Sequence, residues 1–232
     1  MIQLFENLYK VKKMEKYDIK LLDTLDITIK NEIDQYAKLV QFYKNDTPFL
    51  NDELMKYFYI IIEGKMRTYQ LNLKNSKEQT IFILKSGDMF DTITLLDHKP
   101  HDVMYEVLEN TKALKIPIEH VRVWLRKDDL FSKNFFIYLA SQMRHTEELA
   151  TDLSLHDTLE RLIKLLAQNL DPNNRSKYNL LHNLSHSDIA KLIGTVRHVV
   201  ERHLNSLKNR GAIEASRKYL EVKDLKKLLE NL

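Results

Sequence analysis

Residues 186–207 read HSDIAKLIGTVRHVVERHLNSL and form the most informative segment of the chain. Ser185 or Ser187 can cap a helix over 188–193, Gly194 supplies a turn, and a second helix follows over 197–207. Apolar residues are spaced so that these two helices can pack together: Ile189, Ile193, Val200, Leu204 and Leu207. The segment therefore predicts a helix-turn-helix, followed by a turn over 208–213 and a short β-wing that includes 219–222.

The second helix of this motif has a basic exposed face. Residues 191–210 hold five Lys/Arg and one acid. A helix that reads the major groove needs hydrogen-bonding side chains near its N-terminus and cations for phosphate. Arginine pairs best with guanine O6 and N7, so Arg197 and Arg202 are predicted base readers, and Thr195 and Lys208 are predicted phosphate contacts. The full predicted DNA-contact set is Thr195, Val196, Arg197, His198, Glu201, Arg202 and Lys208. A helical hairpin with a solvated face, or one that binds a protein, is the alternative.

The N-terminal part of the chain predicts helix first and then a β-rich domain. Residues 2–37 have a helical pattern of apolar positions. Short strands are predicted over 57–62, 66–71, 79–84, 103–108 and 112–116, with a hairpin turn at 63–65. Several short strands separated by turns are typical of a barrel or a sandwich.

A long helix without Gly or Pro is predicted over 131–153. Its residues near a/d spacing are Phe135, Leu139, Met143, Thr146, Leu149 and Leu153. Such a seam packs either on its own domain or against a second copy of the chain, and the spacing does not choose between them. A further amphipathic helix over 158–170 is expected to stop before Asp171 and Pro172.

Composition limits the classes of function. The chain has 232 residues and no cysteine, which excludes disulfides, catalytic thiols, thiolate zinc sites and cysteine-ligated iron–sulfur clusters. Residues 154–232 hold 14 Lys/Arg and 9 Asp/Glu, a net charge of +5, whereas residues 1–153 carry a net charge of −2. The basic C-terminal third favours a polyanionic partner. No apolar run approaches the roughly 20 residues that span a bilayer, and no signal peptide is evident, so a cytoplasmic protein without membrane contact is expected.

These pieces resemble the Crp/Fnr superfamily of bacterial transcription regulators. The resemblance is carried by residues 59–65, 84–90 and 153–162, and above all by 188–194 together with Arg197, Val200, Arg202 and Leu204. It implies an α+β fold with a cyclic-nucleotide-binding-like β-barrel of jelly-roll type, a dimerisation helix and a winged helix-turn-helix. The expected boundaries are 1–20 for an N-terminal helical extension, 21–130 for the sensor barrel, 131–154 for the dimer helix and 155–232 for the DNA-binding domain.

The resemblance also implies the partners. The expected protein is a homodimer on a palindromic operator of double-stranded DNA, and RNA polymerase is a further partner if the protein activates transcription. His198 stands where many members have a Glu that accepts from cytosine, so the operator is expected to depart from the commonest half-site of the family.

The signal is not expected to be cyclic AMP. Members that bind cyclic nucleotides have a Glu for the ribose and an Arg for the phosphate after the Gly-Asp pair. Here Thr92 stands at the Glu position, and no Arg occurs between Asp88 and Val121. Haem is a second interpretation, with His98 as axial ligand, His101 close by, and Met89 and His120 as further candidates. The alternative for these histidines is a surface loop, and a small organic effector, or no effector at all, is equally consistent with the sequence. The effector-pocket candidates are Asp91, Thr92, His98 and His101.

An enzyme is not expected. The sequence shows no P-loop, dinucleotide fingerprint or Ser-His-Asp arrangement. A cupin-like metalloenzyme that uses His98, His101 and Glu106 is the alternative from another class, but two of these ligands flank Pro100 in a predicted loop instead of alternating along a strand.

Overall fold

The chain folds into two compact units in a computed structural model that describes residues 26–49, 52–168, 170, 180–216 and 219–230. The first unit contains residues 1–68 and 82–144, and the second contains 69–81 and 145–232. The predicted extension at 1–20 lies outside the described residues. No helix among the described ranges has the length and apolar character needed to cross a membrane.

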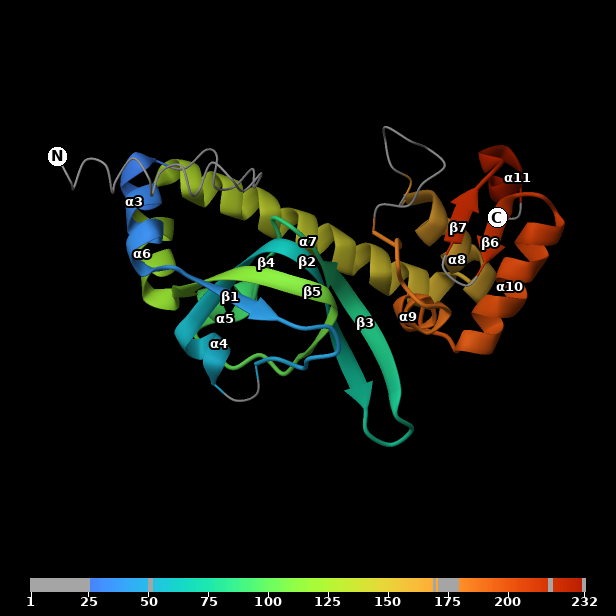
Figure 1. The fold of residues 1–232 in the computed structure, drawn as a ribbon, viewed down its shortest axis with the longest axis horizontal. Coiled ribbons are helices and arrows are strands. Elements are labelled where there is room, and N and C mark those ends of the chain that lie inside the picture. The colour runs from blue at the N-terminus through green and yellow to red at the C-terminus, as the bar shows by residue number, and fades with distance from the viewer. Residues whose placement is uncertain (1–25, 50–51, 169, 171–179, 217–218, 231–232) are drawn as a thin grey trace. The chain divides into compact units, whose positions relative to one another are not determined.

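Five strands form the main sheet (Figure 1). They are β1 (Lys38–Phe42), β2 (Tyr57–Asn72), β3 (Lys77–Leu84), β4 (Met89–Phe90) and β5 (Met104–Pro117). The order is β1-β5-β2-β3, and β4 pairs with β2. The edge strand β1 runs antiparallel to β5, with Phe42 opposite Thr111. The strand pattern confirms the predicted mixed α and β architecture.

The predicted hairpin turn at 63–65 is wrong, because β2 continues through it. Gly64 has φ +101°, and a Cβ atom there would lie 2.4 Å from the Asn110 carbonyl oxygen. Glycine is therefore present because β5 approaches closely, not because the chain reverses. The chain turns instead at 73–76, where the Asn72 side chain accepts from the Lys74 amide and the Asn75 side chain accepts from the Lys77 amide.

The two strands predicted over 103–108 and 112–116 are one strand, β5. Its C-terminal half pairs with β1 over five residues, and it also neighbours β2 in the sheet. The polar residues Glu109 and Asn110 are typical of a turn. Both sides of β5 have hydrogen-bonding partners in the sheet, however, and this pairing keeps the backbone extended.

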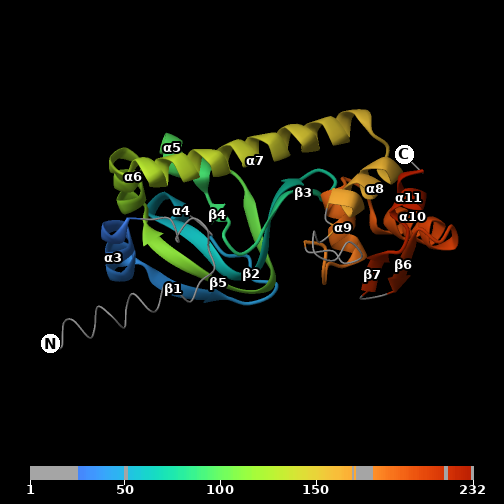
Figure 2. The ribbon, with the colours of Figure 1, turned by 90° about the horizontal axis from the view of Figure 1, so that it is seen from above.

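Helices pack at one end of the first unit's sheet (Figures 1 and 2). They are α3 (Ile27–Tyr36), α6 (Ile118–Lys127) and the beginning of α7 (Asp129–Leu155), and the shorter α4 (Glu53–Lys56) and α5 (Thr92–Asp97) also belong to this unit. Trp124 of α6 is 3% exposed and donates from its indole N–H to Glu32 at 2.6 Å. The Asp128 carboxylate caps α7 by accepting from the Phe131 amide at 2.6 Å. These helices and the sheet enclose one apolar core.

A second core in this unit is rich in aromatic rings. The Phe49 ring contacts those of Phe42, Tyr59, Phe90 and Tyr105, with centroids 4.8 to 5.3 Å apart. Tyr59 and Phe90, which are opposite each other in the β2–β4 pair, have stacked rings. Aromatic pairs of this kind add to the stability gained from apolar burial.

The second unit contains the predicted helix-turn-helix and wing (Figure 2). Its elements include α8 (Thr158–Gln168), α9 (His186–Leu192), α10 (Arg197–Asn209), β6 (Ile213–Ser216), β7 (Tyr219–Val222) and α11 (Leu225–Leu229). Ser185 begins α9 through a capping box, in which its hydroxyl accepts from the Asp188 amide and the Asp188 carboxylate accepts from the Ser185 amide. The residues predicted to join the two helices are all buried: Ile189, Ile193, Val200, Leu204 and Leu207.

Candidate nucleic-acid interface

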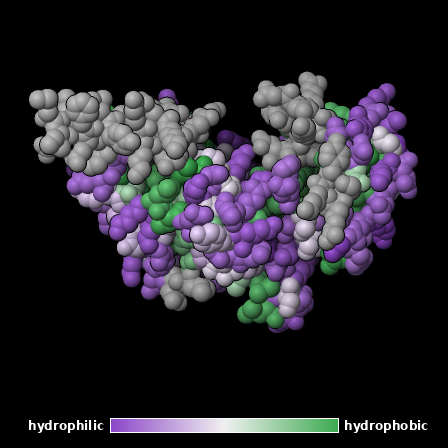
Figure 3. Space-filling view, viewed as in Figure 1, coloured by the Kyte–Doolittle hydropathy of each residue, from purple (hydrophilic) through white to green (hydrophobic). Residues whose placement is uncertain are grey.

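Helix α10 buries one face and presents the other to solvent. Val200, Leu204 and Leu207 are at most 3% exposed and pack into the core of the second unit. The side chains of Arg197, His198 and Arg202 are exposed. The space-filling view shows mainly hydrophilic residues over the region of α10 (Figure 3). A rigid helix with an exposed cationic face has the form needed to enter a DNA major groove.

The turn before α10 places further predicted contacts beside this face. The Thr195 amide donates to the Ala190 carbonyl at 2.8 Å, which closes the turn between the helices. Val196 is the N-cap residue of α10, and its side chain is 49% exposed. At the other end of α10, Lys208 Nζ donates to the Ala215 carbonyl of β6 at 3.2 Å. Lys208 thus lies between the helix and the wing, where its charge also remains exposed to solvent.

An ion-pair network lies on the exposed face of α10. Arg197 Nε donates to Glu201 Oε1 at 2.7 Å, one helical turn away. The Nδ1 atom of His186, from α9, lies 3.5 Å from the same oxygen. The hydrogen bond from Arg197, assisted by His186, lowers the pKa of the Glu201 carboxyl below its ordinary value. The four-residue spacing of Arg197 and Glu201 is visible in the sequence. The participation of His186 depends on how α9 crosses α10, and sequence reasoning missed it.

His203 supports α10 from the buried side. Its Nε2 atom lies 2.9 Å from the Thr158 hydroxyl at the start of α8. Burial, and then the charge of Arg202, lower the pKa of His203 below its ordinary value. The imidazole therefore joins α10 to the start of α8.

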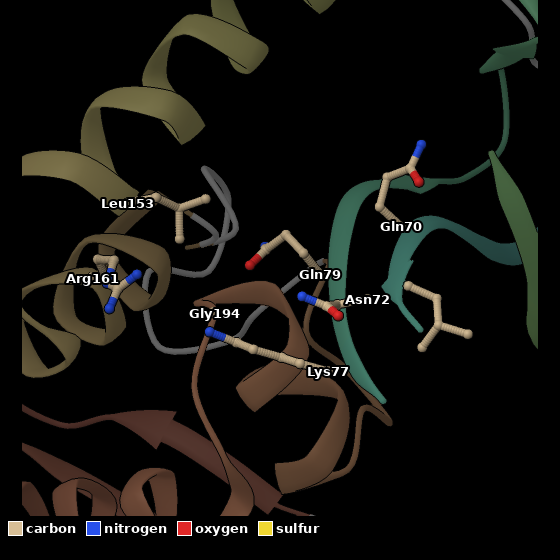
Figure 4. Close-up of a pocket in the computed structure, with 8 residues that line it drawn as sticks. Gln70, Asn72, Lys77, Gln79, Leu153, Arg161 and Gly194 are labelled. Atoms are coloured by element: carbon tan, nitrogen blue, oxygen red, sulfur yellow. The ribbon is translucent and has the colours of Figure 1, made fainter. Parts of the chain in front are cut away.

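A groove of about 630 Å³ lies elsewhere in the second unit (Figure 4). The β2–β3 hairpin contributes Lys77 and Gln79, α8 contributes Arg161, and the helix-turn-helix contributes Gly194. Gln79 Nε2 donates to the Leu192 carbonyl at 3.0 Å, and the Lys191 ammonium lies 2.9 Å from Glu78. The hairpin therefore contacts the C-terminal end of α9.

The predicted effector residues Asp91 and His101 lie together in the first unit. Asp91 Oδ1 is 3.0 Å from His101 Nδ1, and the other carboxylate oxygen accepts from the Thr94 hydroxyl at 2.6 Å. Burial alone would raise the pKa of Asp91, but the hydrogen bonds from His101 and Thr94 outweigh it and lower the pKa below its ordinary value. The hydrogen bond with Asp91 raises the pKa of His101.

The other two candidates, Thr92 and His98, stand at opposite ends of α5. Thr92 is the first residue of this helix and is partly buried, whereas His98 ends it in the left-handed conformation and is exposed. Arg122 of α6 holds the helix end, donating to the carbonyls of Leu95 and Thr94 at 3.0 Å each. Arg122 is the next arginine after Arg67 along the chain, and its guanidinium is bound to this backbone.

The geometry does not support the cupin-like metal site. The Glu106 carboxylate accepts from Arg67 Nε at 2.6 Å, and Arg67 is 2% exposed. His101 is committed to Asp91, and His98 points to solvent at the end of α5. Within the described ranges, no group of three or more His, Asp or Glu residues is placed to hold a metal ion.

Family models match both parts of the chain. A model described as the cyclic nucleotide-binding domain matches residues 39–128, and a model described as the Crp-like helix-turn-helix domain matches residues 160–230. This chain belongs to the Crp/Fnr superfamily of transcription regulators.

Two curated Crp/Fnr relatives align over most of the chain. The "Cyclic AMP receptor protein" of Thermus thermophilus is 27% identical over 180 residues, which cover 76% of this chain and 79% of that protein. The "CRP-like cAMP-activated global transcriptional regulator" of Mycobacterium tuberculosis is 26% identical over 192 residues, which cover 82% and 85%. The chain is thus a DNA-binding regulator of the Crp/Fnr type.

Solved Crp/Fnr structures have the same fold. A CooA mutant from Carboxydothermus hydrogenoformans superposes with a TM-score of 0.71 at 24% identity, covering 87% of this chain and 89% of that one. FixK2 from Bradyrhizobium japonicum also has a TM-score of 0.71, at 20% identity, with coverage of 84% and 96%.

The long Crp/Fnr helix, α7, requires one correction to the predicted seam. Phe135 is fully buried in the core of its own unit, because α7 begins by packing on the sheet and α6, so it is not available to a partner. Leu139 also packs against that core. The exposed apolar side chains of α7 include Met143 of the predicted seam, which is 67% exposed, together with Phe136 at 57% and Ile137 at 58%.

The candidate haem ligands of this Crp/Fnr chain occupy three different environments. Met89 is 3% exposed in the core, the His120 ring stacks on Tyr36 with centroids 3.9 Å apart, and His98 is exposed. Haem stays a prediction from the sequence.

Proposed function

We propose that this chain is a homodimeric Crp/Fnr regulator that reads a palindromic operator with α10 and responds to a signal other than cyclic AMP. The observation that carries the proposal is the exposed row of Arg197, His198 and Arg202 on a helix whose opposite face is fully buried. Arg197 and Arg202 read guanines, and Thr195, Val196 and Lys208 contact the backbone around them.

Dimerisation is assigned to α7. Met143 lies two helical turns after Phe136 on the same face, and both side chains are more than half exposed. An exposed apolar helix face of this kind suits a second copy of the helix. Thr146, Leu149 and Leu153 complete the interface that we propose. Two-fold symmetry then places the recognition helices about one turn of DNA apart, roughly 34 Å.

The sensor site argues against a cyclic nucleotide. The region after the Gly-Asp turn holds the buried Asp91 carboxylate, which repels a phosphate, and Thr92 stands at the position of the ribose-binding acid. Arg122, the next arginine along the chain, is bound to the backbone of α5. We therefore do not assign to this chain the cyclic AMP that appears in the names of its relatives. The protein acts in the cytoplasm, and RNA polymerase is its partner at promoters that it activates.

Binding-site selection from random duplex DNA tests this function, with purified protein at two salt concentrations. An inverted repeat with a guanine in each half-site is expected, and Arg197→Ala should relax one half-site position at a cost of about 1–3 kcal/mol. Enrichment that is independent of sequence would contradict operator reading. Calorimetry with cyclic AMP is the companion measurement, and micromolar binding would overturn the proposal about the signal.

A further inference from the structure

We propose that Glu201 is a positioning residue that sets the direction of the Arg197 guanidinium for base recognition, and that His186 anchors Glu201 from the neighbouring helix. This inference rests on the proposed function, in which Arg197 reads a base. It assigns specificity to a carboxylate that need not touch the DNA.

The hydrogen bond uses the inner nitrogen of the guanidinium. Arg197 donates to Glu201 through Nε at 2.7 Å, and in the described part of the chain the guanidinium has no other partner. The two terminal nitrogens, Nη1 and Nη2, therefore keep the parallel donors that match guanine O6 and N7. A carboxylate that binds Nε fixes the plane of the guanidinium and leaves both terminal nitrogens available to the base.

The fold itself gains little from this ion pair. The Arg197 side chain is 69% exposed and the Glu201 side chain 38% exposed, and exposed pairs contribute little to stability. The pair acquires another role when DNA covers it. Desolvation in the DNA major groove strengthens the attraction between Arg197 and Glu201. An arginine that is already held in one direction also loses less rotamer entropy when it binds DNA.

His186 restrains the carboxylate from the other side. Its Nδ1 atom lies 3.5 Å from Glu201 Oε1, and its side chain is 28% exposed. His186 is the first residue of α9, immediately after the capping serine. Glu201 is thereby tied to both helices of the motif, so its position does not depend on α10 alone.

The experiment measures discrimination at the guanine that Arg197 reads. Wild type, R197A, E201A, E201Q, H186A and the double variant R197A/E201A are titrated against the selected operator, its single-base variants at each position and random duplex DNA. E214Q is the matched control, because it removes an exposed acid from the wing that pairs with Lys223 and not with Arg197.

The expected pattern separates positioning from a general effect. R197A lowers the discrimination between guanine and the other bases at one operator position by roughly 5- to 150-fold. E201A lowers the discrimination at that same position by roughly three- to tenfold. E201Q, whose amide oxygen still accepts from Nε, retains most of the discrimination, and H186A shows a smaller loss at the same position. In the R197A background, E201A has no further effect on discrimination. Binding of E201A to random DNA does not fall, because a negative charge has been removed.

Other outcomes overturn the proposal in distinguishable ways. If E201A relaxes a different base position from R197A, Glu201 reads DNA directly. If E201A behaves like E214Q, the ion pair is only a surface contact. In both cases wild type still selects an operator, and the proposed function stands. If wild type selects no operator, or R197A relaxes no position, the base-reading role itself fails and Glu201 has nothing to position.

Discussion

Asp91 Oδ1 lies 3.0 Å from His101 Nδ1, and the acid is buried while the imidazole reaches solvent. The pair joins the start of α5 to the segment that leads into β5, across the region assigned to the sensor. The two pKa shifts have opposite signs, as expected for a carboxylate and an imidazolium that stabilise each other's charges.

This pair predicts a pH-dependent stability. The pKa of His101 is raised in the folded protein. Its contribution to the stability of the fold is therefore complete below the pKa of the unfolded chain, about 6.5, and is lost as the pH rises through the pKa of the folded protein. The Asp91 pKa is lowered, so that contribution is present above about 3.9 and is lost as pH falls through the folded value. We expect His101→Gln to destabilise the first unit by about 1 kcal/mol at pH 5.5 and by less at pH 8.5.

Urea unfolding followed by the fluorescence of Trp124 measures this difference, because Trp124 is the chain's single tryptophan and lies in the first unit. His98→Gln is the control, since His98 is exposed at the end of α5. A His101→Gln penalty that is equal at both pH values would contradict the charge pairing.

Gly64 predicts a severe packing defect. An alanine there would place Cβ 2.5 Å from Thr111 Oγ1 and 2.4 Å from the Asn110 carbonyl, at a φ of +101°. We expect Gly64→Ala to cost more than about 3 kcal/mol, because two strand backbones would have to separate. Gly87→Ala is the matched comparison, with a similar φ of +87° and no atom within 4 Å. Its expected cost is the left-handed backbone alone, about 1–2 kcal/mol. If Gly64→Ala and Gly87→Ala lower the stability to urea equally, the close approach of β5 is not the cause of the loss at Gly64.

The exposed face of α7 predicts the oligomeric state. Phe136→Glu combined with Met143→Glu should convert the dimer to a monomer, because like charges would be buried against each other across the two-fold axis. Phe136→Leu with Met143→Leu keeps the face apolar and should remain dimeric. Size-exclusion chromatography with light scattering gives the mass. A charged variant that keeps the dimer mass would place the interface elsewhere.

Lys208 predicts a change in the salt dependence of DNA binding. If its ammonium contacts phosphate, Lys208→Gln should reduce the slope of log K against log salt by about 1 and weaken binding to all sequences alike. Lys226→Gln, which removes an exposed cation from α11, should leave the slope unchanged. An unchanged slope for Lys208→Gln would mean that Lys208 serves only to hold the Ala215 carbonyl of the wing.

The helix-turn-helix was predictable because its signals are local. A capping serine, a turn glycine and buried residues three to four positions apart all lie within 23 residues of chain, and the structure places them as expected. The strands were less predictable. Gly64 has the same local signature in a hairpin and in a strand that a neighbour approaches closely, and only the position of β5 distinguishes the two.

The proposed site residues also divide into those that local sequence predicts and those that it does not. Arg197, His198 and Arg202 follow from the helical repeat, which separates exposed from buried positions. His186 and the Arg67–Glu106 pair depend on contacts between distant segments, which no local pattern encodes. Phe135 packs in the core of its own unit, a choice that the sequence leaves open because the heptad spacing of an apolar seam is the same for a partner helix and for the protein's own core.

The chain passes between its two units three times, within β2, within β3 and within α7. A single crossover at one point of this chain therefore does not exchange a whole unit. A recombination point near residue 145 would transfer the recognition helix but leave the hairpin segment 69–81 with the old sensor. Chimaeras made at that point are expected to need a hairpin segment that matches the transferred unit.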